Sequence, residues 1–320
     1  FVNSIFKEEN KLNEVELGKY YGSIDNNNSR IVFNEELLHP FQPYNITATA
    51  NQLSFFDKVF NSPIKLDPYD QIWFWKELLT LLNMILSFIM IIPISKFFLK
   101  MSFFKFIIKK IPTALPSQNI KSKKIFWLLF TISSGVACVS FIPMVDIAKE
   151  LFPDASNRNL TWFFPQRMNN SVMLWAMFNG IFGIILFYLS YIIYGKKNGV
   201  SKKSWGLDIT KNELLKTFIL GILVFISYYL ILYIIYFIFH IDYRFWFMGV
   251  RVFQPKMIII LFMYAPFFFL FFFSNSLRVN GGMRFQNQTE WISRLIAALG
   301  NSAGLILIII IQYFVFYLTG

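Results

Sequence analysis

Apolar residues gather in long runs from about residue 78 to the end of the 320-residue chain. Six of these runs are drawn as spans, at 78–98, 125–147, 172–194, 218–239, 257–274 and 303–319. A helix rises about 1.5 Å per residue, so runs of this length cross a hydrocarbon core of roughly 30 Å. Lipid offers the backbone no hydrogen-bond partner, and uninterrupted runs must therefore be helical. The pattern predicts a mainly α polytopic membrane bundle of about six spans.

Residues 1–70 have a different pattern and are predicted to form a separate domain, with the membrane domain at 71–320. The turn-rich "SIDNNNS" at 23–29 is followed by a short β-like run at 30–33. A loop containing His39 comes next. In the stretch 45–60, Leu53, Phe56 and Val59 recur at helical spacing. The order is therefore strand, loop with a histidine, and amphipathic helix.

The loop charges predict how the bundle is oriented in the cell membrane. The first loop has lysines and no acid, the third loop is also rich in lysine, and the fifth has arginines: Lys96, Lys100, Lys105, Lys109, Lys110, Lys121, Lys123, Lys124; Lys196, Lys197, Lys202, Lys203, Lys211, Lys216; Arg278, Arg284, Arg294. Basic residues mark cytoplasmic loops. The segment before the first span is therefore expected outside the cytoplasm. Within the first loop, 101–110 alternates lysines with large apolar residues and predicts an interfacial helix.

Composition agrees with a membrane protein. The chain is 56% hydrophobic and only 15% charged, whereas soluble domains have about 25% charged residues. The net charge of +12 does not indicate nucleic-acid binding, because most lysines lie in the loops between spans. Cys138 is the single cysteine, which rules out an intrachain disulfide and a cysteine metal site. We predict no cofactor and no metal. The expected partners are the lipid bilayer and an unidentified small molecule or peptide.

The predicted spans contain almost no ionisable residues in their interiors, which argues against ion-coupled transport. Asp146 lies near Lys149 and is expected at the interface. Within the spans, the polar residues expected to make interhelical hydrogen bonds are Asn83, Asn179 and Gln312. His240 and Asp242, after the fourth span, are expected at the membrane boundary. They are also the one candidate pair for a membrane-embedded acyltransferase.

The segment "GNSAG" at 300–304 matches the G-x-S-x-G pattern of a hydrolase nucleophile. That pattern requires a strand, a sharp turn and a helix. Ser302 instead precedes the last span, on the predicted cytoplasmic side, and it follows His39 in the chain, opposite to the order in α/β-hydrolases. We interpret these small residues as helix-packing positions.

The segment "YYGSIDNNNSRIVFNEELLHPFQPYNITATANQLSFFDKVF" at 20–60 resembles the C-terminal end of an α/β-hydrolase of the dienelactone-hydrolase or peptidase-like kind. "QIWFWKELLTLL" and the helices after it resemble the membrane portion of bacterial membrane-anchored α/β-hydrolases. The resemblance implies that 1–70 is the remnant of an external hydrolase domain with His39 as its catalytic histidine. It also implies a serine nucleophile and a carboxylate, expected mostly before Phe1. No role is assigned to Glu8, Glu9, Glu14 or Glu16, and the 320 residues alone are expected to be inactive.

Three functions compete with one another on the sequence alone. The first is a membrane-anchored serine hydrolase that cleaves an ester, thioester or amide. The second is a membrane transporter or lipid-handling protein with a small external cap. The third is a helical anchor without chemistry of its own, which combines readily with the first.

Overall fold

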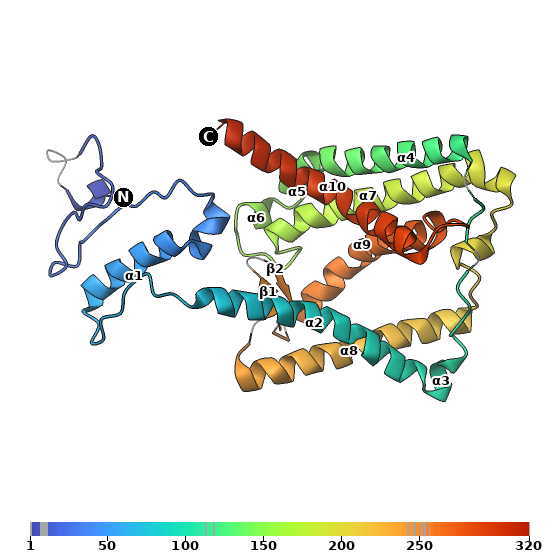
Figure 1. The fold of residues 1–320 in the computed structure, drawn as a ribbon, viewed down its shortest axis with the longest axis horizontal. Coiled ribbons are helices and arrows are strands. Elements are labelled where there is room, and N and C mark those ends of the chain that lie inside the picture. The colour runs from blue at the N-terminus through green and yellow to red at the C-terminus, as the bar shows by residue number, and fades with distance from the viewer. Residues whose placement is uncertain are drawn as a thin grey trace. The chain divides into compact units, whose positions relative to one another are not determined.

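The computed structural model describes residues 2–6, 12–112, 114–117, 119–241, 243–245, 248–250, 252, 254–255 and 257–319, except for the side chains of residues 39, 40, 202, 248, 316 and 319. The chain divides into two compact units. Figure 1 shows the ribbon coloured by residue number. The first unit contains Phe1–Phe98 and Ile222–Val252, and the second contains Leu99–Gly221 and Phe253–Gly320. Each unit is described separately below.

The predicted bundle of spans is confirmed within the described part of the chain. Six helices there are long and apolar enough to cross a membrane: Trp73–Leu99 (α2), Ile120–Val139 (α4), Arg167–Asn198 (α7 and its extension), Lys211–Phe239 (α8), Met257–Gly282 (α9 and its extension) and Glu290–Val315, within α10. These helices make the protein multi-pass. Most of them begin or end beyond the apolar runs, because helical hydrogen bonding continues through flanking polar residues.

The first unit contains short elements together with α2 and most of α8. Its elements are the 3-10 helices Val2–Ile5 (η1) and His39–Tyr44 (η3), the helix Ile46–Phe60 (α1), and an antiparallel hairpin of Tyr243–Phe245 (β1) and Met248–Val250 (β2). The Tyr228 hydroxyl donates to Ser87 Oγ at 3.2 Å and joins α8 to α2.

The run at 30–33 was predicted to be a strand, and this prediction was wrong. Arg30 forms a single antiparallel bridge with Tyr21, and the Gly18 N–H donates to the Val32 carbonyl at 2.8 Å. The segment therefore folds back on the residues just before it, across the turn that contains Asn27. The sheet of an α/β-hydrolase domain is absent from the described residues, whose one sheet is the β1–β2 hairpin.

The second unit is a helical bundle with short connecting helices. In order, it contains Ser102–Lys105 (α3), α4, Phe141–Leu151 (α5), Pro153–Ser156 (α6), Arg167–Ser190 (α7), a π-helix at Tyr191–Gly195 (η4), 3-10 helices at Lys196–Asn198 (η5) and Lys202–Trp205 (η6), Met257–Leu277 (α9), a π-helix at Arg278–Gly282 (η7) and Glu290–Thr319 (α10). Helix α7 packs most extensively on α9, and α4 lies beside α10 (Figure 1).

Two predicted helices of the second unit have different boundaries in the structure. The span expected at 125–147 is two helices, α4 and α5, which meet at Ser140. Pro143 lies in the first turn of α5, where its missing N–H costs little, so it begins a helix instead of kinking one. The interfacial helix expected at 101–110 is limited to α3. Pro112 disfavours helical geometry in the residue before it, and the chain there runs extended toward the start of α8.

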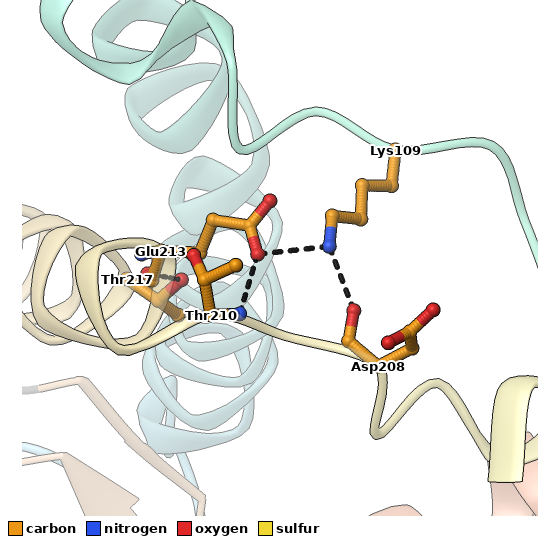
Figure 2. A network of polar contacts seen from close by, with 5 residues as sticks. All are labelled: Lys109, Asp208, Thr210, Glu213 and Thr217. Atoms are coloured by element: carbon orange, nitrogen blue, oxygen red, sulfur yellow. Dashed lines mark hydrogen bonds and ion pairs between the residues drawn. The ribbon is translucent and has the colours of Figure 1, made fainter.

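A polar network holds that extended segment against the start of α8 (Figure 2). The Lys109 ammonium donates to Glu213 Oε2 at 2.9 Å and to the Asp208 carbonyl at 2.7 Å. Thr210 and Glu213 form a capping box, in which the Thr210 N–H donates to the carboxylate at 2.7 Å and the Glu213 N–H donates to the hydroxyl at 3.3 Å. The lysine-rich segments before α4 and before α8 are therefore joined at the protein surface.

The core of the second unit has both apolar and polar layers. Met173 and Leu174 of α7 pack with Tyr264 of α9 in one buried cluster. Within that cluster the Tyr264 hydroxyl donates to the Asn170 side chain, whose amide donates to the Phe164 carbonyl at 2.8 Å. Buried polar groups in a membrane protein need such partners. This layer fixes the relative position of α7 and α9 at one end of the bundle.

Orientation can be tested with single cysteines. In a Cys138→Ala background, Asn26→Cys should react with a membrane-impermeant maleimide on intact cells, because the charge pattern places its loop outside. Lys197→Cys, also exposed, should react only after the membrane is permeabilised. Labelling of Lys197→Cys alone on intact cells would reverse the predicted orientation.

Candidate functional site

His39, the predicted catalytic residue, is the first residue of η3, directly before α1. Its side chain lies outside the described atoms. The helix after it was predicted correctly: the Asn45 side chain accepts a hydrogen bond from the Ala48 N–H at 2.9 Å and caps α1. A helix therefore follows His39 as expected, without the strand before it.

An open hollow lies next to this segment. It is formed by the stretch before η3 and by the first turns of α1, with Phe33, Asn34, Glu35, Asn45, Thr47 and Asn51 on its surface. The Glu35 carboxylate accepts a hydrogen bond from the Asn51 amide at 2.6 Å. These groups satisfy one another, and the described residues bring no serine nucleophile to this hollow.

The carboxylates weighed for a triad do not form a described site. Glu8 and Glu9 lie outside the described residues. Glu16 forms an exposed ion pair with Lys19 at 2.8 Å, and Glu14 is exposed. His240 ends α8, and its ring contacts that of Tyr236; Asp242, its proposed partner, lies outside the described residues.

The "GNSAG" segment lies inside α10, as its interpretation as packing material requires. The Ser302 hydroxyl donates to the Ala298 carbonyl at 2.7 Å, a bond within one helix. A β-carbon on Gly304 would stand 2.6 Å from the β-carbon of Ala137 on α4. The glycine therefore permits the close approach of α4 and α10.

A cavity lies in the second unit, between the ends of α4, α7 and α9 that adjoin the lysine-rich loops. Its volume is about 130 Å³, and it opens at one side. Aromatic rings form two of its walls: Phe126, Phe130 and Phe285 on one side, and Phe187, Tyr191 and Trp205 on the other. Apolar walls with a few polar groups are typical of ligand pockets.

Arg278 is the charged residue of this cavity. Its Nη1 donates to Ser133 Oγ of α4 at 3.0 Å, and its Nη2 donates to the Gly300 carbonyl of α10 at 2.9 Å. A guanidinium has five N–H donors, so three have no hydrogen-bond partner among the residues that the structure describes. The described residues supply Arg278 with no carboxylate. A charge in such surroundings marks a functional site by default.

Two π-helices bring residues to this cavity. Helix α7 continues into η4, which contributes Tyr191, and α9 continues into η7, which begins with Arg278. A π-turn adds a residue to the helical repeat and turns the following side chains to a new direction, and such turns are frequent at functional sites. Here both occur at the ends of the two helices that pack together most extensively.

The sequence interpretation missed Arg278 as a site residue. It was counted only as a loop charge, because the apolar run was drawn to end at 274. The signal available was the stretch "SNSLRVNGG" at 274–282, whose small polar residues keep the helical register of the run before them. Of the span residues expected to bond between helices, Asn179 donates to Ser140 at 3.2 Å, whereas Asn83 and Gln312 make no hydrogen bond with described residues.

The buried polar atoms of the first unit include one oxygen of Glu77 on α2 and the hydroxyl of Tyr243 on β1, which have no hydrogen-bond partner among the described residues. Burial raises the pKa of Tyr243, and the nearby Tyr228 raises it further. Glu77 lies just before the apolar run as drawn from the sequence, so this buried acid was also missed.

Comparison with known proteins does not assign a family. No family model matches the chain, and neither a curated protein nor a solved structure does.

The packing role of Gly304 predicts a difference between two glycine substitutions. Gly304→Ala should destabilise the protein by about 1–3 kcal/mol, because the new methyl group overpacks the α4–α10 contact. Gly135→Ala in α4 is the matched control. Its β-carbon would meet nothing within 4 Å, so the better helix propensity of alanine should leave stability unchanged or raise it by up to about 1 kcal/mol. Thermal unfolding in detergent measures both, and equal effects would contradict the packing role.

Proposed function

We propose that the chain anchors a serine hydrolase in the membrane, with His39 as the general base of an ester, thioester or amide cleavage. The observation that supports this is the order of elements: His39 begins η3, which leads directly into the capped amphipathic helix α1. In α/β-hydrolases the histidine loop after the last strand precedes a closing helix of this kind. The six apolar helices would then serve as the anchor.

The surface of α1 also supports the proposal. Leu53 and Phe56 are each 43% exposed, and Phe60 is 73% exposed. These residues recur on one face of the helix and lack a covering layer within the described residues. Exposed apolar faces of this size usually have a partner. A hydrolase sheet is the partner that the resemblance implies.

In the proposed mechanism His39 accepts the proton of a serine hydroxyl and later donates it to the leaving group. The serine would come from outside these 320 residues, since Ser302 bonds within its own helix. A carboxylate would orient the imidazole, and no described glutamate is assigned to that role.

The Arg278 cavity favours a second function, the binding of an amphiphile by the helical bundle. An unneutralised cation among aromatic walls is poorly explained by anchoring alone, because an anchor needs only apolar helices. This function is compatible with the first, since the two use different residues.

The hydrolase proposal predicts covalent labelling by a fluorophosphonate probe. The full-length gene product, in membranes, should be labelled, and His39→Asn should abolish labelling, because the serine then lacks its base. His240→Asn is the matched control, since it changes the other of the two histidines. Asparagine also suits the left-handed backbone of residue 240, with φ of 51°.

Labelling that is lost in His39→Asn and kept in His240→Asn supports the proposal, provided that both variants elute from size exclusion like the parent protein. Undiminished labelling of His39→Asn would eliminate a role for this histidine. A parent protein that takes up no probe would argue against the hydrolase itself.

A further inference from the structure

We propose that the Arg278 cavity binds an amphiphile with one anionic group, a carboxylate or phosphate joined to an apolar body. This rests on the second candidate function, amphiphile binding, and not on the hydrolase proposal. The anionic group would bind the Arg278 guanidinium, and the apolar body would lie between the aromatic walls.

The position of Arg278 supports an anionic ligand. It bonds to Ser133, which is eleven residues after Ser122 on α4 (133 minus 122), and both serines line the cavity. Eleven residues correspond to about 16 Å along a helix. The guanidinium therefore lies well inside the bundle, away from the helix start. A cation at such depth is costly unless an anion or several hydrogen bonds compensate it.

The bonds of Arg278 leave room for that anion. Ser133 and Gly300 are neutral acceptors and use two of its donors. A carboxylate or phosphate accepts two parallel N–H bonds from one guanidinium, a geometry that a single neutral acceptor cannot match. If Arg278 served only to join α4 to α10, its two hydrogen bonds would suffice, and neither its remaining donors nor the cavity beside them would be needed.

The walls indicate the apolar part of the ligand. The rings of Phe126 and Phe285 are 5.6 Å apart, and the Trp205 ring is 5.1 Å from Phe187 and 4.8 Å from Tyr191. Leu129 and Leu186 add aliphatic surface. A hydrated inorganic anion would leave this surface uncovered, whereas a hydrocarbon chain or ring would bury it, at roughly 25 cal/mol per Å².

Exposed lysines stand next to lining residues in the chain. Lys121 and Lys123 flank Ser122, and Lys196 follows Gly195. Because these lysines adjoin lining residues in the chain, they add positive charge near the cavity, and such charge raises the local concentration of anions. The same charge disfavours cationic amphiphiles.

The test is the binding of bromoundecanoate to the full chain in phosphatidylcholine nanodiscs. Bromine quenches nearby indoles, so quenching that disappears in Trp205→Phe reports this cavity. Bromoundecanoate should bind at least about tenfold more tightly than bromoundecanol, which has the same chain without the charge. This comparison uses the unaltered protein and does not depend on the folding of a variant.

Arg278→Gln should weaken bromoundecanoate binding by about tenfold or more and leave bromoundecanol binding unchanged. Arg294→Gln is the matched control: Arg294 is exposed, pairs with Glu290 and does not line the cavity. Leu129→Phe, which keeps the charge, enlarges the side chain and adds no indole, should reduce binding of both probes. Equal affinity for the two probes, or undiminished carboxylate binding in Arg278→Gln, would overturn the proposal.

A last arm separates the two sources of such a ligand. If an anionic lipid occupies the cavity, phosphatidylglycerol in the nanodisc should compete with bromoundecanoate and weaken its apparent binding. If the ligand is a free amphiphile, phosphatidylglycerol should have no effect while the preference for the charged probe persists. Either result supports the anionic site. A failed fluorophosphonate experiment would not affect it, because the two readouts share no residue.

Discussion

The close contact between α7 and α9 is the constraint on which the second unit depends. At Gly180 a β-carbon would stand 3.0 Å from the backbone of Phe271, so the two helices touch through their main chains. In a bilayer, where lipid tails are as apolar as side chains, such close packing is a main source of helix association. Because both helices continue as π-helices at the same end, this contact also brings Tyr191 and Arg278 to one cavity.

Two clusters of polar groups in the described part of the second unit differ in how many of their hydrogen-bond donors lack a partner. Near the start of α7, the Tyr264 hydroxyl donates to the Asn170 side chain, whose amide donates to the Phe164 carbonyl, so these groups bond to one another. Toward the other end of the bundle, Arg278 bonds to Ser133 and Gly300 beside an open cavity, and its other donors have no partner among the described residues. The first cluster, in which the polar groups bond to one another, holds α7 and α9 together. The second cluster has the properties of a binding site, because it combines charge, aromatic surface and access.

In the first unit, helix α1 has apolar side chains that the described residues do not cover. Stacking of Tyr20 on Phe55, with the Lys58 ammonium 3.6 Å above the Tyr20 ring, holds the 18–35 stretch against α1. Phe56 and Phe60 remain exposed.

The amino-acid sequence by itself determined the number of helices long and apolar enough to cross a membrane and the position of α1. The length of an apolar run and the helical periodicity are local properties of the chain, and they do not depend on contacts between distant residues. The sequence also identified residues 300–304 as helix-packing positions. It could not determine that 30–33 would pair with the residues before its own turn instead of with a sheet, or that the helix would continue beyond α9 through Arg278 and bring it to Ser133. Those outcomes depend on contacts between residues far apart in the chain. Only the tertiary structure decided them, since a hydrogen bond or a helix crossing forms only when both partners are brought together.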